Sequence, residues 1–394
     1  MQPAPYNLGL DLVRAASIVA VICSHTLEWW LPPGDQTTIL AAYLGMAGVE
    51  AFFSLSGFLI GGILLRAIDG GLGPRALGRF WTRRWMRTLP AYWVLILGLG
   101  WYHGAQDWSG LDWRSPFFLQ NFVPRSLWTP LTPHTWSLVL EEWFYLFVPV
   151  LLAVGVAVIR TVRWAPPIVC ALLIAACMAG RAAVGLAPGP VWGAEPNINP
   201  ILRLDCAAWG VLAAWAVRQG TLPRNAAAAM LAAGGALLVL AGVIWVRLFH
   251  PETLMPYGFA VWGPAWQPGQ PAVLELGAAM VLLGLHRLLP RGRGVLAWAA
   301  GATARLSYAL YLVHVPVIYL ARQAGLDDAA GCWPRIGMLS LMLGAALILR
   351  YGVELPALAL RDRLAPDHRN TRSHGNNPST PAANSAMNAG APGG

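Results

Sequence analysis

Apolar residues fill about ten stretches of this chain, and shorter polar segments rich in Arg, Pro or Trp separate them. A helix needs about 20 predominantly apolar residues to cross the hydrocarbon core of a bilayer. The pattern therefore predicts an all-α polytopic membrane protein with about ten transmembrane helices. The predicted spans are residues 8–30, 40–65, 88–103, 138–159, 166–186, 203–217, 226–248, 272–289, 304–321 and 335–355.

The composition agrees with membrane insertion. Hydrophobic residues make up 57% and charged residues 11% of the chain, and the mean hydropathy is +0.53. These values exclude an ordinary soluble domain. The net charge of +9 comes from arginines in short loops between apolar runs. Positive-inside insertion explains that distribution better than binding to nucleic acid does.

The same arginines predict the topology. With the N-terminus in the cytosol, most arginines fall in cytosolic segments, namely 66–87, 160–163, 218–224, 287–293 and 361 onward. Both termini are therefore predicted to be cytosolic. No cleaved signal peptide is expected, because charged residues interrupt the first apolar run. Residues 1–360 are predicted to form one membrane domain, and residues 365–394, rich in Asn, Pro, Gly and Ala, a disordered cytosolic tail.

The first predicted span carries three groups that lipid disfavours, Asp11, Arg14 and His25. Asp11 and Arg14 are one turn apart and close enough to pair. Arg14 and His25 are eleven residues apart, which returns them to nearly the same helix face about 16 Å apart along the axis. Ionisable groups in a span usually face the protein interior and mark function. The alternative interpretation is a polar seam that holds helices together.

Polar residues also lie in the second and third spans. In GVEAFFSLSGFLI, Glu50 is a candidate functional carboxylate, whereas Ser56 and the glycine after it favour close helix packing. In RFWTRRWMRTLP, a basic stripe on a helix is predicted, with one further arginine beside it. The stripe is Arg79, Arg83 and Arg87, and the neighbour is Arg84. Anchoring at the cytosolic surface explains arginines here, and guanidinium groups also suit phosphates.

Three later stretches add candidates. In PHTWSLVLEEWFYL, Glu141 is expected to face the bundle and hold His25 in one tautomer, whereas Glu142 points outward or caps the helix. The run ARLSYALYLVHVPV contributes Tyr308 and His314, for which a packing role is an equal alternative. In RLDCAAWG, an ion pair that lines an outer cavity is predicted between Arg203 and Asp205.

Together, five stretches resemble the acyltransferase-3 family of integral membrane O-acyltransferases, in the order that the family shows. They are LDLVRAASIVAVICSH, with the Arg-x10-His signature of the family, GVEAFFSLSGFLI, RFWTRRWMRTLPAYW, TWSLVLEEWFYL and LSYALYLVHVPV. The resemblance covers residues 8 to about 355. It implies that Arg14 and His25 are functional, that Glu141 lies in the active site, and that the arginine cluster faces the donor.

For a member of this family, the resemblance implies a cytosolic acyl-CoA donor, acetyl-CoA by family habit, and no metal. It implies a carbohydrate or glycolipid acceptor at the outer face of the inner membrane, and a site in contact with membrane lipid. Some relatives carry an extracytoplasmic SGNH hydrolase-like domain. The chain as given shows none, so it is expected to act alone or to pass its acyl group to a separate periplasmic protein.

Several alternatives stay open at the level of sequence. Intramembrane Arg, His and Glu also serve transporters, which would export a small acyl compound or a lipid-linked sugar without chemistry. A different class of membrane acyltransferase also depends on an intramembrane histidine. Direct transfer and an acyl-enzyme need the same imidazole, so the sequence does not separate them. The acceptor, the acyl chain and the oligomeric state are equally open.

Overall fold

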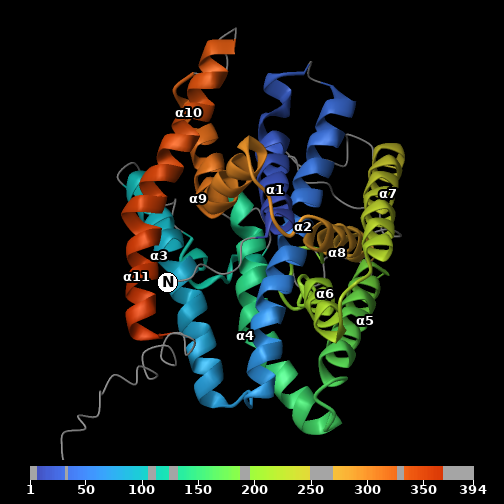
Figure 1. Cartoon of the computed structure of the whole chain (residues 1–394). Helices are drawn as coiled ribbons and strands as arrows, with labels where there is room; N and C mark the ends of the chain where they lie inside the picture. Colours follow the sequence, from blue (N-terminus) through green and yellow to red (C-terminus); the bar gives the residue numbers. More distant parts are fainter. Residues whose placement is uncertain are drawn as a thin grey trace, which may run out of the picture.

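The computed structural model describes residues 7–31, 34–104, 112–123, 132–186, 196–248, 269–325 and 332–366. Within these residues the regular structure is helical and no strand occurs, which confirms the predicted all-α fold. The α-helices are α1 (Leu8–Thr26), α2 (Asp35–Asp69), α3 (Pro74–Gly104), α4 (Trp136–Ile159), α5 (Ala165–Leu186), α6 (Ala208–Gln219), α7 (Arg224–Leu248), α8 (Gln270–Leu288), α9 (Val295–Gln323), α10 (Cys332–Leu349) and α11 (Leu355–Leu364) (Figure 1).

Short helical turns complete the described secondary structure. The 3-10 turns are η1 (Leu27–Trp29), η3 (Ser115–Phe117), η4 (Gln120–Phe122) and η6 (Pro133–Thr135). A π-helical turn, η8 (Arg350–Glu354), joins α10 to α11 without a break. The predicted last span, 335–355, therefore belongs to a longer helical rod that packs along α3.

Eight described helical segments are long and apolar enough to cross a bilayer. Two of the predicted spans, 88–103 and 203–217, lie in helices that are not among these eight. Helix α3 begins at Pro74 and carries five arginines before residue 88, which lowers its apolar content. Helix α6 has only 12 residues, because residues 203–207 form a turn rather than the first turns of a helix.

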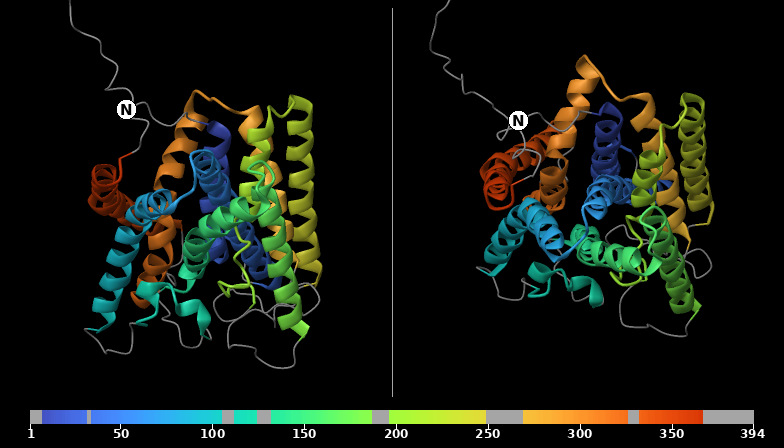
Figure 2. Two further views of the ribbon diagram at one scale, coloured as in Figure 1. Left: turned by 90° about the horizontal axis from the view of Figure 1, so that it is seen from below. Right: turned by 60° about the horizontal axis from the view of Figure 1, so that its bottom comes forward.

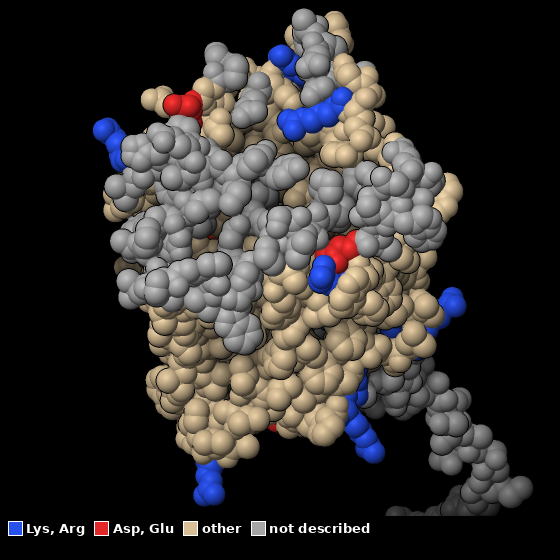
Figure 3. Space-filling model, turned by 180° about the vertical axis from the view of Figure 1, so that it is seen from behind, with Lys and Arg blue, Asp and Glu red and all other residues tan. Residues whose placement is uncertain are grey.

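The outer surface is that of a multi-pass membrane protein. Val158, Val239 and Ile348 project outward with 68–76% of their surface exposed. Apolar exposure on this scale needs an apolar solvent or a partner to cover it. Figure 3 shows a broad band of uncharged residues across the lower part of one face, with charged side chains at its edges.

Helices α1 and α2 lie inside the bundle. Helix α2 packs against α1, α6, α8 and α7, and α1 packs against α9 and α8 as well. The views in Figures 1 and 2 agree that α3, α10 and α11 form one flank and α5 and α7 the other, with α1, α2 and α4 between them. Polar side chains on α1, α2 and α4 can therefore face protein rather than lipid.

Glycine lets α2 approach the start of α6. A Cβ atom added to Gly57 would lie 1.9 Å from the backbone oxygen of Ala207, and one added to Gly210 would lie 2.0 Å from that of Ser54. Small residues allow helix backbones to approach this closely in membrane proteins. The predicted packing role of Gly57 is therefore confirmed by the geometry.

We expect Gly57→Ala to unfold the protein at a markedly lower temperature than Gly62→Ala, although both substitutions lie in α2. The added methyl group at residue 57 meets backbone that cannot turn aside, whereas at residue 62 the nearest atom is a flexible Arg66 nitrogen at 3.6 Å. Overpacking costs about 1–3 kcal/mol. Thermal unfolding of both variants in the same detergent tests this, and equal midpoints would contradict it.

The membrane topology and the predicted disordered tail stay predictions. The structure carries no bilayer, and residues 367–394 of the predicted tail lie outside the described residues.

Candidate active site

Three histidines from separate elements meet beside α1. The ring of His25, in the last turn of α1, lies 5.1 Å from the ring of His314 on α9. The His314 ring lies 5.0 Å from that of His134 in the turn η6. His314 and His134 are buried, while His25 is half-buried. These three residues are the histidine cluster of the following paragraphs.

Tyr311 and Ser137 frame the histidine cluster. The Tyr311 hydroxyl donates to the backbone oxygen of His134 at 2.5 Å and shares a hydrogen bond of 2.5 Å with the Ser137 hydroxyl. Tyr311 lies on α9 one turn before His314, and Ser137 lies in the first turn of α4. The contacts therefore tie α9 and the start of α4 together around the three rings.

A second polar group centres on Glu141 of α4. Its carboxylate accepts hydrogen bonds from the Ser56 hydroxyl at 2.5 Å, from Arg84 Nη2 at 2.9 Å, and from the Tyr145 hydroxyl. The Arg84 guanidinium also lies over the Tyr145 ring, 3.9 Å from its centre. Helices α2, α3 and α4 each contribute to this group.

Two further arginines join Arg84. Arg14 of α1 and Arg87 of α3 lie close enough to Arg84, and to each other, for their positive charges to repel one another. Arg14 pairs with Asp11 at 3.5 Å, as the sequence predicts. The side chain of Arg87 is exposed, whereas those of Arg14 and Arg84 are partly covered. We call Arg14, Arg84 and Arg87, with Glu141, the arginine cluster.

Helices α1 and α4 each connect the two clusters. Arg14 and His25 lie about 16 Å apart along one face of α1. On α4, Ser137, Glu141 and Tyr145 recur every four residues and so share one face, which runs about 12 Å from the histidine end to the arginine end. The site is therefore a polar column along the bundle, with cations at one end and imidazoles at the other.

The predicted pairing of Glu141 with His25 is not what the structure shows. The hydrogen bonds described for Glu141 go to Ser56, Arg84 and Tyr145, and the ring beside His25 is His314. The reason lies in helix geometry, because Glu141 is a full turn further along α4 than Ser137, the α4 residue that frames the histidine cluster. Ser56, for which the sequence predicts a packing role, also donates a hydrogen bond to Glu141.

The arginines of the predicted stripe on α3 do not all face the same way, because some face α11 and others face the polar column. Arg83 faces α11, where it bonds to the backbone oxygen of Ala365 and lies 3.4 Å from Asp362. Arg84 and Arg87, one turn apart, face the column instead. Arg79 is half-buried near the start of α3, and no ion pair to it occurs among the described residues. Sequence spacing could not decide this, since α11 is distant in the chain.

Glu142 and Tyr308 meet around Thr88 of α3. Glu142 is buried and accepts from the Thr88 hydroxyl at 2.9 Å, so its predicted outward orientation is wrong. The Tyr308 hydroxyl donates to the backbone oxygen of Thr88 at 2.8 Å. Both interactions fasten α3 to its neighbours beside the arginine cluster.

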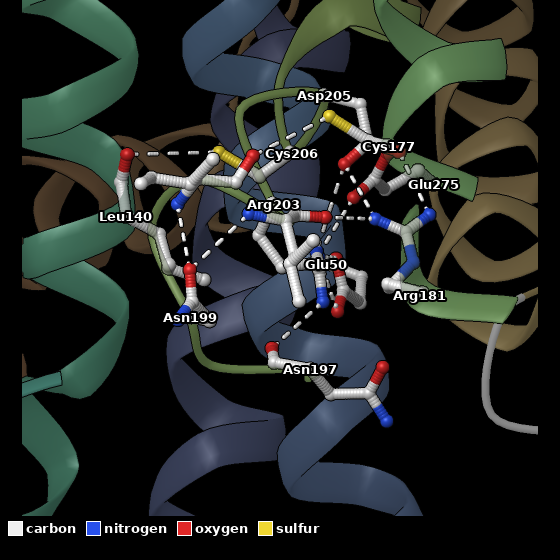
Figure 4. Close-up of polar contacts among 12 residues, drawn as sticks. Glu50, Leu140, Cys177, Arg181, Asn197, Asn199, Arg203, Asp205, Cys206 and Glu275 are labelled. Atoms are coloured by element: carbon white, nitrogen blue, oxygen red, sulfur yellow. Dashed lines mark hydrogen bonds and ion pairs between the residues drawn. The ribbon is translucent and has the colours of Figure 1, made fainter. Parts of the chain in front are cut away.

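Arg203, Asp205 and Glu50 belong to a third group, away from the column, which Figure 4 shows. Arg203 Nη2 lies 2.8 Å from a Glu50 carboxylate oxygen and 2.9 Å from Glu275 of α8. Asp205 instead binds both terminal nitrogens of Arg181 of α5, each at 2.8 Å. The five side chains are at most 1% exposed. We call them the buried ion network.

The predicted ion pair that lines an outer cavity therefore needs correction. Arg203 Nε and Asp205 are 3.9 Å apart, a weak contact beside their stronger partners, and both residues are buried. The network instead fastens the non-helical segment 196–207 to α2, α5 and α8. Non-helical backbone inside a membrane protein is tolerated only where protein or water satisfies it.

Three members of these groups were not singled out from the sequence. They are Tyr145, Arg181 and Glu275. The available signal was the cost of an ionisable group in an apolar run, which Arg181 and Glu275 show as clearly as Glu50 does. Among the described residues, no group of three or more His, Cys, Asp or Glu side chains is arranged to hold a metal ion.

Comparison with known proteins adds the identity of the domain. The acyltransferase-3 family model, which describes an acyltransferase domain, matches residues 7–352. The chain belongs to this family. The prediction of a membrane acyltransferase is thereby confirmed at the level of the family, and no solved structure matches the chain.

Curated relatives of this acyltransferase-3 chain include proteins of Listeria monocytogenes and Staphylococcus aureus. A peptidoglycan O-acetyltransferase of Listeria monocytogenes is 32% identical over 165 residues, which are 38% of this chain and 24% of that protein. A Staphylococcus aureus protein provisionally named an O-acetyltransferase is 30% identical over 174 residues, 37% of this chain and 25% of its own length. The matches thus span about a quarter of these relatives.

We expect Arg203→Leu to lower the free energy of unfolding by about 3–5 kcal/mol, because it leaves two buried carboxylates without a cation. The matched control is Arg218→Leu, which removes an ion pair with Asp69 whose side chains are 38% and 49% exposed. An exposed pair contributes about 0–1 kcal/mol. Denaturant unfolding in detergent micelles measures both variants, and a similar loss in the two would show that the network is not needed.

Proposed function

We propose that this chain transfers an acyl group from cytosolic acyl-CoA to a hydroxyl of a carbohydrate-containing acceptor at the outer face of the inner membrane. The observation that carries the proposal is the polar column. It joins a cationic end, suited to the phosphates of a donor, to an imidazole end, suited to proton transfer. The names of the relatives, O-acetyltransferases that include a peptidoglycan O-acetyltransferase, favour an acetyl group and a cell-envelope glycan.

The arginine cluster fits the donor. Arg87 is exposed and would bind phosphate oxygens of acyl-CoA, with Arg14 and Arg84 beside it. Guanidinium groups bind phosphates through paired hydrogen bonds. Asp11 and Glu141 would hold Arg14 and Arg84 in place, because each carboxylate already pairs with one of them. Arg83 is left out of this role because it is engaged with α11.

The histidine cluster supplies the base. His25 is the half-buried member, so an acceptor can reach it. In direct transfer, His25 takes the proton of the acceptor hydroxyl while the oxygen bonds to the acyl carbon, and the proton then goes to the departing CoA sulfur. An acyl-enzyme on the same imidazole would need one more step. In either route the chain delivers to the glycan itself or through a separate protein.

His25→Ala is expected to lower the transfer of label from radioactive acetyl-CoA into an alkali-labile glycan fraction by about 100-fold or more. Membranes that contain the wild type or the variant, supplied with glycans extracted from a bacterial envelope, provide the measurement. Equal incorporation by both would remove His25 from the chemistry. Absence of label with acetyl, succinyl and longer acyl-CoA donors would overturn the proposed acyltransferase.

Arg87→Gln should raise the KM for acyl-CoA by about 10-fold or more with little change in kcat, because a charge-assisted phosphate contact is worth about 1.5–3 kcal/mol. Arg83→Gln is the matched control, since it lies on the same helix and faces α11. Its KM should stay near that of the wild type. A larger effect at residue 83 than at residue 87 would place the donor on the other face of α3.

A further inference from the structure

Hydrogen bonds to backbone oxygens determine the tautomers of two histidines. His314 Nδ1 lies 2.7 Å from the backbone oxygen of Tyr311, and His134 Nε2 lies 3.2 Å from that of Leu312. A carbonyl oxygen can only accept a hydrogen bond, so each of these nitrogens carries its proton. The neutral His314 is therefore protonated on Nδ1, and the neutral His134 on Nε2.

Each ring is left with one bare nitrogen. Among the described residues, neither His314 Nε2 nor His134 Nδ1 has a hydrogen-bond partner, although both rings are almost completely buried, at 0% and 2% exposure. An unsatisfied buried acceptor costs about 1–3 kcal/mol. Such atoms in a native fold call for an explanation, such as a role in function. Both bare nitrogens can only accept a hydrogen bond, so a polar group that contacts them must be a hydrogen-bond donor.

Two histidine rings lie next to His314. The His134 ring is 5.0 Å away, but its N–H, on Nε2, already donates to the Leu312 oxygen. The His25 ring, whose centre is 5.1 Å from that of His314 at a tilt of 53°, is the other candidate donor. Two imidazoles that share a hydrogen bond through one nitrogen each have centres about 5 Å apart, because N···N is close to 3 Å. The observed separation of the His25 and His314 ring centres is therefore the separation that such a hydrogen bond requires.

We propose that His314 is a positioning residue that accepts a hydrogen bond from His25 through its bare Nε2. This inference rests on the proposed function, in which His25 is the base. One His25 nitrogen then donates to His314, and the other is left unprotonated to face the acceptor hydroxyl. His314 takes the role that the sequence assigned to Glu141.

The proton balance limits what His314 does. When His25 takes the hydroxyl proton it becomes an imidazolium with two N–H groups, one of which still donates to His314 Nε2. His314 keeps its own proton on Nδ1 against the Tyr311 oxygen, so it does not need to accept one. As the thioester C–S bond breaks, the imidazolium then gives its new proton to the departing CoA sulfur. His314 thus orients His25 and stabilises its charged form without entering the reaction.

Two substitutions separate the nitrogens of His314. An Asn side chain can keep the donor near the position of Nδ1, while it removes the acceptor at Nε2. A Gln side chain can present an acceptor near the position of Nε2. We expect His314→Asn to lower kcat by about 10- to 100-fold with an unchanged KM for acyl-CoA, as loss of an orienting partner does elsewhere. His314→Gln should retain most of the activity. Equal loss in both variants, or a change confined to KM, would contradict the proposal.

Nitrogen NMR gives a second readout that does not depend on transfer. The chain has eight histidines, so selective ¹⁵N-histidine labelling of the full chain in nanodiscs yields few signals. The His25→Gln variant assigns the His25 signals. His25 should populate one tautomer in the wild type and in His314→Gln, and a mixture in His314→Asn. Unchanged His25 tautomers in His314→Asn would overturn the inference at any level of activity.

The two proposals fail separately in this experiment. A His25 tautomer that depends on His314, in a wild type that transfers no label from any acyl-CoA, would overturn the proposed function and retain the contact between the rings. An active wild type in which the His25 tautomer does not depend on His314 would overturn the contact between the rings and retain the proposed function.

Discussion

The cost of burying charge in a membrane protein governs how this bundle is built. Arg203 is fully buried, and its strongest partners are the carboxylates of Glu50 of α2 and Glu275 of α8. Asp205, two residues later, forms a bidentate salt bridge with Arg181 of α5. One buried turn therefore contacts three helices through ion pairs, and removal of either arginine would leave a carboxylate without its main cation in the interior.

This arrangement leaves the opposite side of α2 available for function. Phe53 and Ser54 lie toward the buried ion network, where Arg203 stacks near the Phe53 ring and the Ser54 hydroxyl donates to the backbone of Glu275. Phe52 and Ser56 face the other way, toward Tyr311 and Glu141. A single helix thus separates a fully buried structural network from a polar column that keeps partial contact with solvent.

The polar column combines two kinds of chemistry that need different surroundings. Its arginine end is partly exposed, and its guanidinium groups are spread over α1 and α3. Its histidine end is drier, with two rings held by backbone oxygens. Electrostatic and hydrogen-bonding effects are stronger where water is excluded. In the proposed function, a site that binds the donor phosphates at one end and moves a proton at the other would benefit from this difference.

The sequence by itself determined the class of fold, the family and most of the polar residues that matter. Long apolar runs dictate helices in lipid, and an Asp, Arg, Glu or His inside such a run is costly enough to stand out. Local spacing was also sufficient for Asp11 with Arg14, which are one turn apart in α1. The tertiary structure alone decided the partners. Glu141 bonds to Ser56 and Arg84 rather than to His25, Arg83 turns to α11, and Arg203 prefers carboxylates 153 and 72 residues away to the nearby Asp205. Helical periodicity describes one helix face at a time, whereas partners across a bundle depend on how the helices rotate and cross, which no single segment encodes.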